Sequence, residues 1–230
     1  MPSKRVGVPC GIGLGVRSHL ALSLTTRVKL QICWLESLRI SWPRCKMADV
    51  GASDNQGEMA DLLAKQEITE LLYRYCRGVD RLDMELVRSC YHPDATDSHG
   101  TFEGTVDEYL VWSERLLRRY TGSVHTVLNV LIEVEPDPVA SAGEGIVRWA
   151  RSEAHGIARH WTEGGPPELN LSVGFRFIDD VCQRGDGPWL ISRRLATTEW
   201  VREEQFRPFD ERFLRGSRDR SDPVYAPRPG

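Results

Sequence analysis

Hydrophobic residues in the first half of the chain recur at steps of three and four, which is the period of an α-helix. This pattern predicts a long helix over about residues 58–80 and a short one over about residues 84–90. The apolar face of the long helix consists of Ile68, Leu71, Leu72, Tyr75, Cys76 and Val79. A third helix is expected over about residues 106–120, with Thr105 as its N-cap. We therefore expect three helices before the first long strand.

The period changes to two after Gly122, which predicts strands over about residues 124–134, 141–159, 169–181 and 189–201. A short hairpin is expected between the second and third helices, where Pro93 ends the helix. In the first long strand, the alternation places only apolar residues on one side and a mixed set on the other. The apolar side has Val124, Leu128, Val130, Ile132 and Val134, and the mixed side has His125, Val127, Asn129 and Leu131. The mixed side suits a ligand cavity, whereas the apolar side suits a partner subunit.

Helices followed by strands joined through short turns predict an α+β domain with helices packed on one face of a curved antiparallel sheet. A length of 230 residues allows one such domain with tails. Residues 1–46 hold 8 basic side chains and a single acidic one, so the rest of the chain carries 22 basic and 32 acidic side chains. An acidic body argues against nucleic acid as a partner.

The first 46 residues show no sustained period, and two interpretations of them stay open. They resemble a targeting peptide, because transit peptides are Arg-rich and poor in acids. Alternatively they are upstream sequence, with Met47 as the natural start. We expect residues 1–57 to form a poorly ordered extension. The chain has no run of about 20 apolar residues, so we expect no membrane span and a cytoplasmic protein.

Residues 202–230 are charged and contain several prolines, which predicts a tail that is ordered only where aromatic residues such as Phe213 and Tyr225 find apolar surface. The cysteines of the domain, Cys76, Cys90 and Cys182, lack the spacing of metal ligands. We therefore expect no metal site and a reducing compartment.

Asp80 falls just beyond the apolar face of the long helix, at about 100° per residue. From the helix alone, two interpretations stay open. Asp80 is either a solvated residue at a helix end or a carboxylate that reaches the buried side.

Several ordered motifs make the chain resemble the SnoaL-like proteins of the nuclear transport factor 2-like superfamily, over about residues 58–201. They are the helix ending in Tyr75-x4-Asp80, the segment Tyr91-His92-Pro93-Asp94-Ala95, the strand start His125-x3-Asn129, Arg176-Phe177-Ile178-Asp179 and Trp189-x-Ile191-Ser192-Arg193-Arg194. The resemblance implies a cone-shaped fold, in which three N-terminal helices close a strongly curved, mainly antiparallel sheet around an apolar pocket.

Dehydratases and a dehydrochlorinase of this superfamily use an aspartate from the first helix and a histidine from the first long strand as a catalytic pair. The resemblance assigns these roles to Asp80 and His125, and it assigns to Tyr75 the polarisation of a substrate carbonyl. A histidine titrates near neutral pH, and a carboxylate beside it fixes the tautomer and favours the protonated form. His125 would then take a proton from carbon and deliver it to a departing hydroxyl.

The substrate-binding candidates are Asn129, Tyr91, Trp112 and Arg194. An exposed strand arginine is the alternative interpretation of Arg194. Glu153 and His155 stay unassigned, because a register slip of one residue reverses the face they occupy. His92 and His99 are expected to be structural, since they precede Pro93 and Gly100.

The leading hypothesis is a cofactor-independent lyase or isomerase of the dehydratase type, acting on a small cyclic hydrophobic substrate by His–Asp acid/base catalysis. The alternative is a non-catalytic ligand-binding or scaffold subunit, such as the small subunit of a ring-hydroxylating dioxygenase. A homodimer or homotrimer through the outer sheet face is expected in the first case. Fold alone does not decide between them.

Overall fold

The computed structural model describes residues 52–135, 146–164, 170–205 and 210–228. Its elements in chain order are α2 (Ala52–Arg81), α3 (Met84–Arg88), β1 (Tyr91–His99), β2 (Phe102–Thr105), α4 (Val106–Leu117), β3 (Gly122–Val134), β4 (Ile146–Trp161), β5 (Leu171–Arg184), β6 (Trp189–Glu203) and the 3₁₀ turn η2 (Pro223–Tyr225). A six-stranded sheet with few helices confirms the predicted α+β class. The suggested start at Met47 lies outside the described residues.

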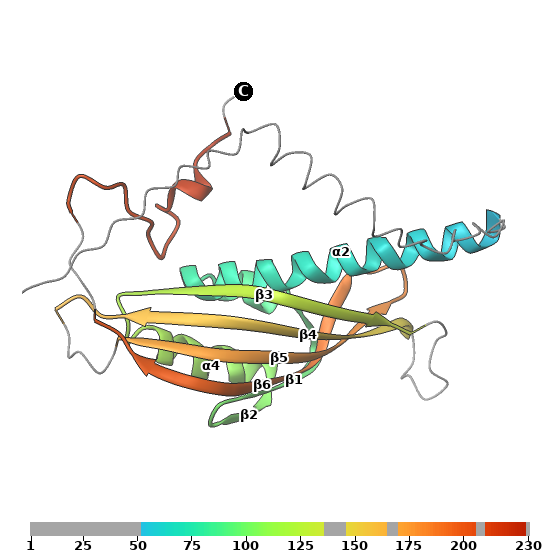
Figure 1. The fold of residues 1–230 in the computed structure, drawn as a ribbon, viewed down its shortest axis with the longest axis horizontal. Coiled ribbons are helices and arrows are strands. Elements are labelled where there is room, and N and C mark those ends of the chain that lie inside the picture. The colour runs from blue at the N-terminus through green and yellow to red at the C-terminus, as the bar shows by residue number, and fades with distance from the viewer. Residues whose placement is uncertain (1–51, 136–145, 165–169, 206–209, 229–230) are drawn as a thin grey trace, which may run out of the picture. The chain divides into compact units, whose positions relative to one another are not determined.

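The strands lie in the order β2-β1-β6-β5-β4-β3 (Figure 1). The four long strands are antiparallel neighbours, as their short connections predict, and the predicted hairpin is formed by β1 and β2. The sheet is completed by a parallel pair of β1 with β6. That pair joins segments far apart in the chain, and it brings residues of the hairpin next to Arg194.

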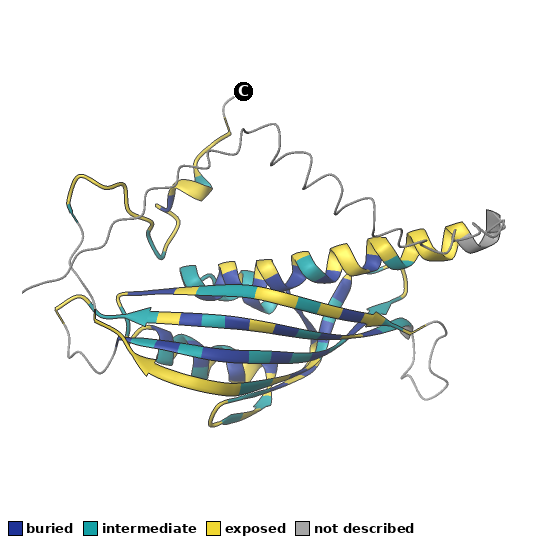
Figure 2. Ribbon diagram, in the orientation of Figure 1, coloured by how far each residue is buried: buried dark blue, intermediate teal, exposed yellow. Residues whose placement is uncertain are grey.

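The core lies between the helices and the face of the sheet that we call the inner face. On α2 this side is buried and the opposite side is exposed (Figure 2), and the buried residues include the whole predicted apolar face. Between residues 150 and 158, the inner positions of β4 have only small side chains or none: Ala150, Ser152, Ala154, Gly156 and Ala158. They leave room for the rings of β5, and a Cβ added at Gly156 would lie 2.3 Å from the ring of Phe175.

The first long strand contains a bulge that overturns part of the predicted alternation. Val127 lies opposite Gly156 in β4, whereas Val130 lies opposite Ala154, so β3 has one extra residue between these pairs. His125, Val127, Val130, Ile132 and Val134 therefore share the inner face. The prediction that His125 shares a side with Asn129 and Leu131 was wrong, because both residues are exposed beyond the bulge.

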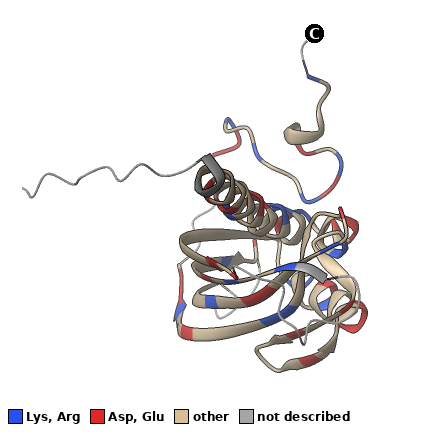
Figure 3. Ribbon diagram, turned by 90° about the vertical axis from the view of Figure 1, so that its right-hand side faces the viewer, with Lys and Arg blue, Asp and Glu red and all other residues tan. Residues whose placement is uncertain are grey.

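The outer face of the sheet carries interleaved charges. Asp180 of β5 pairs with Arg151 of β4 and Arg193 of β6, and Arg176 pairs with Glu153 and Glu199. Basic and acidic residues are accordingly mixed over the same elements (Figure 3). Among the helices of the described ranges, none is both long enough and apolar enough to cross a membrane.

Candidate active site

Asp80 and His125 meet where the last turn of α2 reaches the start of β3. The Asp80 Oδ1 atom lies 2.7 Å from the His125 Nδ1 atom. The main-chain N–H of His125 also donates to both carboxylate oxygens, at 3.1 Å to Oδ1 and 2.9 Å to Oδ2. One carboxylate thus holds the backbone and the ring of the same histidine, which fixes the orientation of the imidazole.

The two side chains of this pair are shielded but not sealed from solvent. The His125 side chain is 10% exposed and the Asp80 side chain is 15% exposed. An ionised carboxylate only accepts hydrogen bonds, so the Nδ1 atom is the donor of this contact, and in the neutral imidazole the lone pair is then on the Nε2 atom. The pair therefore offers a free basic nitrogen in a partly dry setting, which is the arrangement a general base requires. The alternative of a freely solvated Asp80 does not hold.

A second histidine lies beside the first. The ring of His160 meets the ring of His125 edge-on at 5.4 Å between centroids, and it stacks on Tyr120 at 4.7 Å. Burial, followed by repulsion from His125, lowers the pKa of His160 to about 3. His160 therefore stays neutral near pH 7, and its pKa would favour accepting a proton only in acid.

Tyr75 is fully buried on the inner side of α2. Its hydroxyl shares a short hydrogen bond with the hydroxyl of Tyr109 on α4. Burial raises the pKa of the Tyr75 phenol far above its ordinary value, so the group stays protonated. Two hydroxyls that share one hydrogen bond leave one hydrogen unused, and either tyrosine can supply it to a third oxygen.

Arg194 is buried, so the interpretation as an exposed strand arginine was wrong. Its guanidinium donates twice to the carboxylate of Asp179, at 2.8 and 2.6 Å. It also lies over the rings of Tyr75 and Phe177, each 4.0 Å from the guanidinium carbon. Burial alone would lower the pKa of Arg194, but the charge of Asp179 raises it well above its ordinary value. Arg194 thus organises the core behind the site.

Tyr91 and Trp112 lie in the aromatic lining of this core. The Tyr91 hydroxyl donates to the Oδ2 atom of Asp97 at 2.7 Å, so its hydrogen is already in use. Trp112 packs on the rings of Phe102, Tyr109 and His99. Of the four substrate-binding candidates, the structure brings Tyr91 and Arg194 together and places Trp112 near them, whereas Asn129 lies outside this group.

His99, which was predicted to be structural, belongs to the same aromatic group. It faces inward, stacks on Tyr109 at 5.5 Å between centroids, and places its Nδ1 atom 3.5 Å from the Oδ1 atom of Asp97. Asp97 and His99 are two residues apart in β1, so their side chains lie on the same face of the sheet. His92 does have a structural role, since its Nε2 atom lies 3.0 Å from the carbonyl oxygen of Cys182. Glu153 and His155 are paired on the outer face, away from His125.

In the part of the chain that the structure describes, no group of three or more His, Cys, Asp or Glu side chains is arranged to hold a metal ion. An imidazole is a side chain that can accept and donate a proton, and His125 supplies one beside Asp80.

Several solved structures share this fold. A provisionally named scytalone dehydratase from Novosphingobium aromaticivorans is 20% identical, with 66% of this chain and 93% of that chain covered and a TM-score of 0.51. The LinA-type3 hexachlorocyclohexane dehydrochlorinase from Novosphingobium barchaimii is 16% identical, with 68% and 98% covered and a TM-score of 0.51. An NTF2-like protein with a cystatin-like fold from Novosphingobium aromaticivorans is 16% identical, with 66% and 92% covered and a TM-score of 0.51.

At these identities the likeness to solved structures concerns the fold alone. No curated protein is significantly similar to the chain. The model of the SnoaL-like domain, however, matches residues 60–195, which is more than half of the chain and runs from α2 into β6. The chain therefore belongs to the SnoaL-like domain family.

Proposed function

We propose that the protein is a lyase or isomerase of the dehydratase type, in which His125 and Asp80 transfer a proton without a cofactor. The observation that carries the proposal is the 2.7 Å contact between the His125 Nδ1 atom and the Asp80 Oδ1 atom. The two hydrogen bonds that the His125 main-chain N–H donates to the same carboxylate support it, because they help to hold the ring in one orientation.

In the proposed reaction the Nε2 atom of His125 removes a proton from a carbon next to a carbonyl. The electron pair of the broken C–H bond forms a carbon–carbon double bond as a hydroxyl leaves from the neighbouring carbon. The imidazolium then returns its proton to the departing hydroxyl, which leaves as water. Asp80 stays ionised throughout, and its charge stabilises the imidazolium between the two transfers.

A small cyclic hydrophobic molecule is the proposed substrate. The rings of Phe175 and Phe177 lie 4.3 Å apart on the inner face, and Phe175 is 6.1 Å from the ring of His125. An apolar pocket inside a cone-shaped fold, as the family resemblance implies, would strengthen proton transfer by excluding water. Trp112 is proposed to contact the substrate, whereas Tyr91 and Arg194 would support the lining from behind. Asn129 is not proposed again as a substrate contact.

The role of carbonyl polarisation is proposed for the Tyr75–Tyr109 pair as a unit. The single hydrogen that this pair leaves unused would donate to the carbonyl oxygen as negative charge develops there.

A second candidate function rests on the outer face. It exposes Val124, Leu128, Leu131 and Leu195, by 37–62%. Exposed apolar side chains on a sheet favour a subunit contact, either a homodimer or homotrimer of the proposed enzyme or a non-catalytic scaffold bound to a larger subunit. Copurification with an iron–sulfur subunit would favour the scaffold, whereas a homo-oligomer would favour the enzyme.

The proposed function is tested with the His125→Ala variant. A panel of cyclic β-hydroxy ketones and halogenated ring compounds is assayed by mass spectrometry for loss of water or hydrogen halide. We expect the rate to fall by about 100- to 10,000-fold. His155→Ala is the matched control, because this side chain is 47% exposed on the outer face. Full activity of the folded His125→Ala protein on a substrate of the wild type would refute the assignment.

A further inference from the structure

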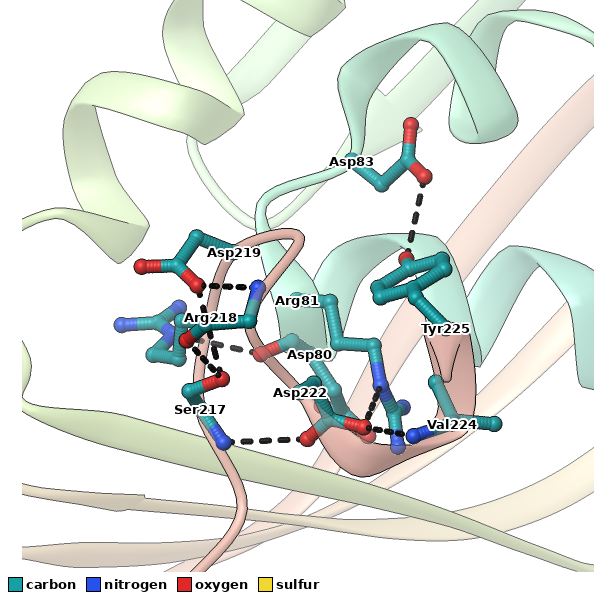
Figure 4. A network of polar contacts seen from close by, with 10 residues as sticks. Asp80, Arg81, Asp83, Ser217, Arg218, Asp219, Asp222, Val224 and Tyr225 are labelled. Atoms are coloured by element: carbon teal, nitrogen blue, oxygen red, sulfur yellow. Dashed lines mark hydrogen bonds and ion pairs between the residues drawn. The ribbon is translucent and has the colours of Figure 1, made fainter. Parts of the chain in front are cut away.

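The C-terminal segment formed by residues 216–226 folds back onto the end of α2. Asp222 organises it, because its side chain accepts from the main-chain N–H groups of Ser217 and Val224, both at 3.0 Å, and pairs with Arg81 at 3.4 Å (Figure 4). Tyr225 donates to Asp83 at 3.1 Å. The segment is anchored by polar contacts, whereas the sequence predicted apolar anchors, and Phe213 is 64% exposed.

Arg218 is the residue of this segment that reaches furthest into the domain. Its Nε atom donates to the main-chain oxygen of Asp80 at 3.2 Å. Its Nη1 atom donates to the main-chain oxygens of Leu117 at 3.1 Å and Tyr120 at 2.8 Å. Its Nη2 atom lies 3.4 Å from the Oγ atom of Ser123. One guanidinium therefore joins the ends of α2 and α4 to the beginning of β3.

Two of these acceptors, the main-chain oxygens of Asp80 and Leu117, belong to the last turns of α2 and α4, and the Leu117 oxygen also accepts from the Tyr120 N–H at 3.1 Å. The last carbonyl groups of an α-helix have no intrahelical donor, and the helix dipole places partial negative charge there. Arg218 meets two such ends with the planar fork of donors that a lysine lacks. Burial lowers the pKa of Arg218, while the charge of Asp80 acts in the opposite direction.

The contacts of Arg218 coincide with the two halves of the candidate catalytic pair. It binds the main-chain oxygen of the residue that supplies the carboxylate, Asp80, and it binds Ser123, two residues before His125. The same segment forms one wall of a groove of about 460 Å³, whose other wall includes Asp80, Ser123 and Trp161. Moving the segment would therefore change the spacing of the pair and the surface beside it.

We propose that Arg218 is a positioning residue, which holds the end of α2 and the start of β3 at the separation that keeps the His125 ring bonded to Asp80. The catalytic consequence rests on the proposed function, but the geometric claim does not, because the pair exists independently of any substrate.

The geometric claim is tested by nitrogen NMR of the histidine rings in the full chain, with His125 assigned by comparison with His125→Ala. In the wild type we expect a single tautomer of His125 with its hydrogen on Nδ1. In Arg218→Ala we expect a mixture of tautomers, because the carboxylate no longer stays in line with the ring. Arg212→Ala is the matched control, since Arg212 lies shortly before this segment, is 87% exposed and pairs with Asp210.

The activity arm uses any substrate that the wild type turns over. We expect Arg218→Ala to lower kcat by about 10- to 100-fold with little change in KM, as misplacement of a catalytic group does. Arg218→Lys should restore only part of the rate and of the tautomer signal, because an ammonium cannot reach all four acceptors. If Arg218→Ala does not fold, Arg218→Lys decides by the same two measurements.

An unchanged His125 tautomer in the folded variant would overturn the proposal, whatever the activity. A different result would separate the two proposals. If Arg218→Ala showed a mixture of His125 tautomers while His125→Ala kept full activity, the positioning role would stand and the proposed function would be refuted. The two failures are thereby distinguished.

Discussion

Two carboxylates on the inner side of the fold each bind a cationic or basic partner, yet they differ in nearly everything else. Asp179 and Arg194 are 0% exposed and joined by two hydrogen bonds. Asp80 and His125 are 15% and 10% exposed and joined by one ring contact and two main-chain bonds. Distance alone does not separate them, because both pairs have contacts of 2.6–2.8 Å.

The difference lies in what each partner can do with a proton. Arginine does not deprotonate in proteins, and the charge of Asp179 raises the pKa of Arg194 further. An imidazole, unlike a guanidinium, can take up and release a proton in proteins, and the His125 side chain is partly open to solvent. The buried pair is therefore suited to holding β5 and β6 together under the aromatic core, and the shielded pair is suited to chemistry.

The largest expected effect concerns the buried pair. Arg194→Ala should lower the free energy of unfolding by about 3–5 kcal/mol, because it leaves the Asp179 charge buried without a partner. Urea denaturation measures this loss. Arg193→Ala, at the exposed neighbouring position, should cost no more than about 1 kcal/mol. If the two variants lost similar amounts of free energy of unfolding, the buried Asp179–Arg194 pair would contribute no more to stability than the exposed one.

The next effect concerns the shielded pair. Asp80→Asn should lower kcat/KM by at least about 100-fold, since a neutral amide neither fixes the tautomer nor stabilises the imidazolium. The variant should fold with a melting temperature near that of the wild type. Asp107→Asn, at a position that is 73% exposed, serves as the control. If Asp80→Asn lost as much stability as Arg194→Ala, the Asp80–His125 pair would be structural, like the Asp179–Arg194 pair.

In the described part of the chain, His160 has no carboxylate partner among its ring contacts, so it can be compared with His125, which has one. The pKa of His160 is lowered to about 3 from 6.5, so this group binds a proton in the unfolded chain before it does so in the folded one. Its contribution to stability is complete above pH 6.5 and is lost as the pH falls toward 3. Between pH 7 and pH 5 this loss amounts to about 2 kcal/mol.

His160→Phe keeps the stacking on Tyr120 and removes the titration. We therefore expect its stability to vary less with pH over this interval than that of the wild type, measured by urea denaturation at each pH. Equal pH dependence in the two proteins would mean that His160 already titrates near its ordinary pKa in the folded state.

Periodicity was sufficient for the parts of the molecule that depend on local alternation. The apolar face of α2 follows from it, and the short connections between the four long strands predict their antiparallel order. The meeting of Asp80 with His125 does not follow from periodicity, because helix periodicity leaves Asp80 at the border of the apolar face. That juxtaposition came from the family resemblance.

The errors have identifiable physical causes. The bulge after Val127 reverses the alternation, so Asn129 points away from the site, and the residue pattern gives no sign of the extra residue. Arg193 and Arg194 occupy opposite faces, and only the pairing of β6 with β1 and β5 decides which of them is buried. Arg218 was missed because its four acceptors come from α2, α4 and β3, a set that no local pattern specifies.

The smallest effect separates the two tyrosines near the buried pair. Tyr75 lies against Arg194, and its hydroxyl shares one hydrogen bond with Tyr109. If Tyr75 supplies the free hydrogen to a substrate carbonyl, Tyr75→Phe should lower kcat by about 10-fold, while Tyr109→Phe should lower it by less. Each variant removes one hydroxyl and leaves the other without its partner, so both should lose a similar 1–3 kcal/mol of stability at most, roughly the cost of one unsatisfied buried group.

Steady-state kinetics measure the loss of kcat, and urea denaturation measures the loss of stability. A larger kinetic loss in Tyr109→Phe would assign the donor to α4 instead of α2, and equal kinetic and stability losses in both variants would leave the tyrosine pair with the structural role that Arg194 already has.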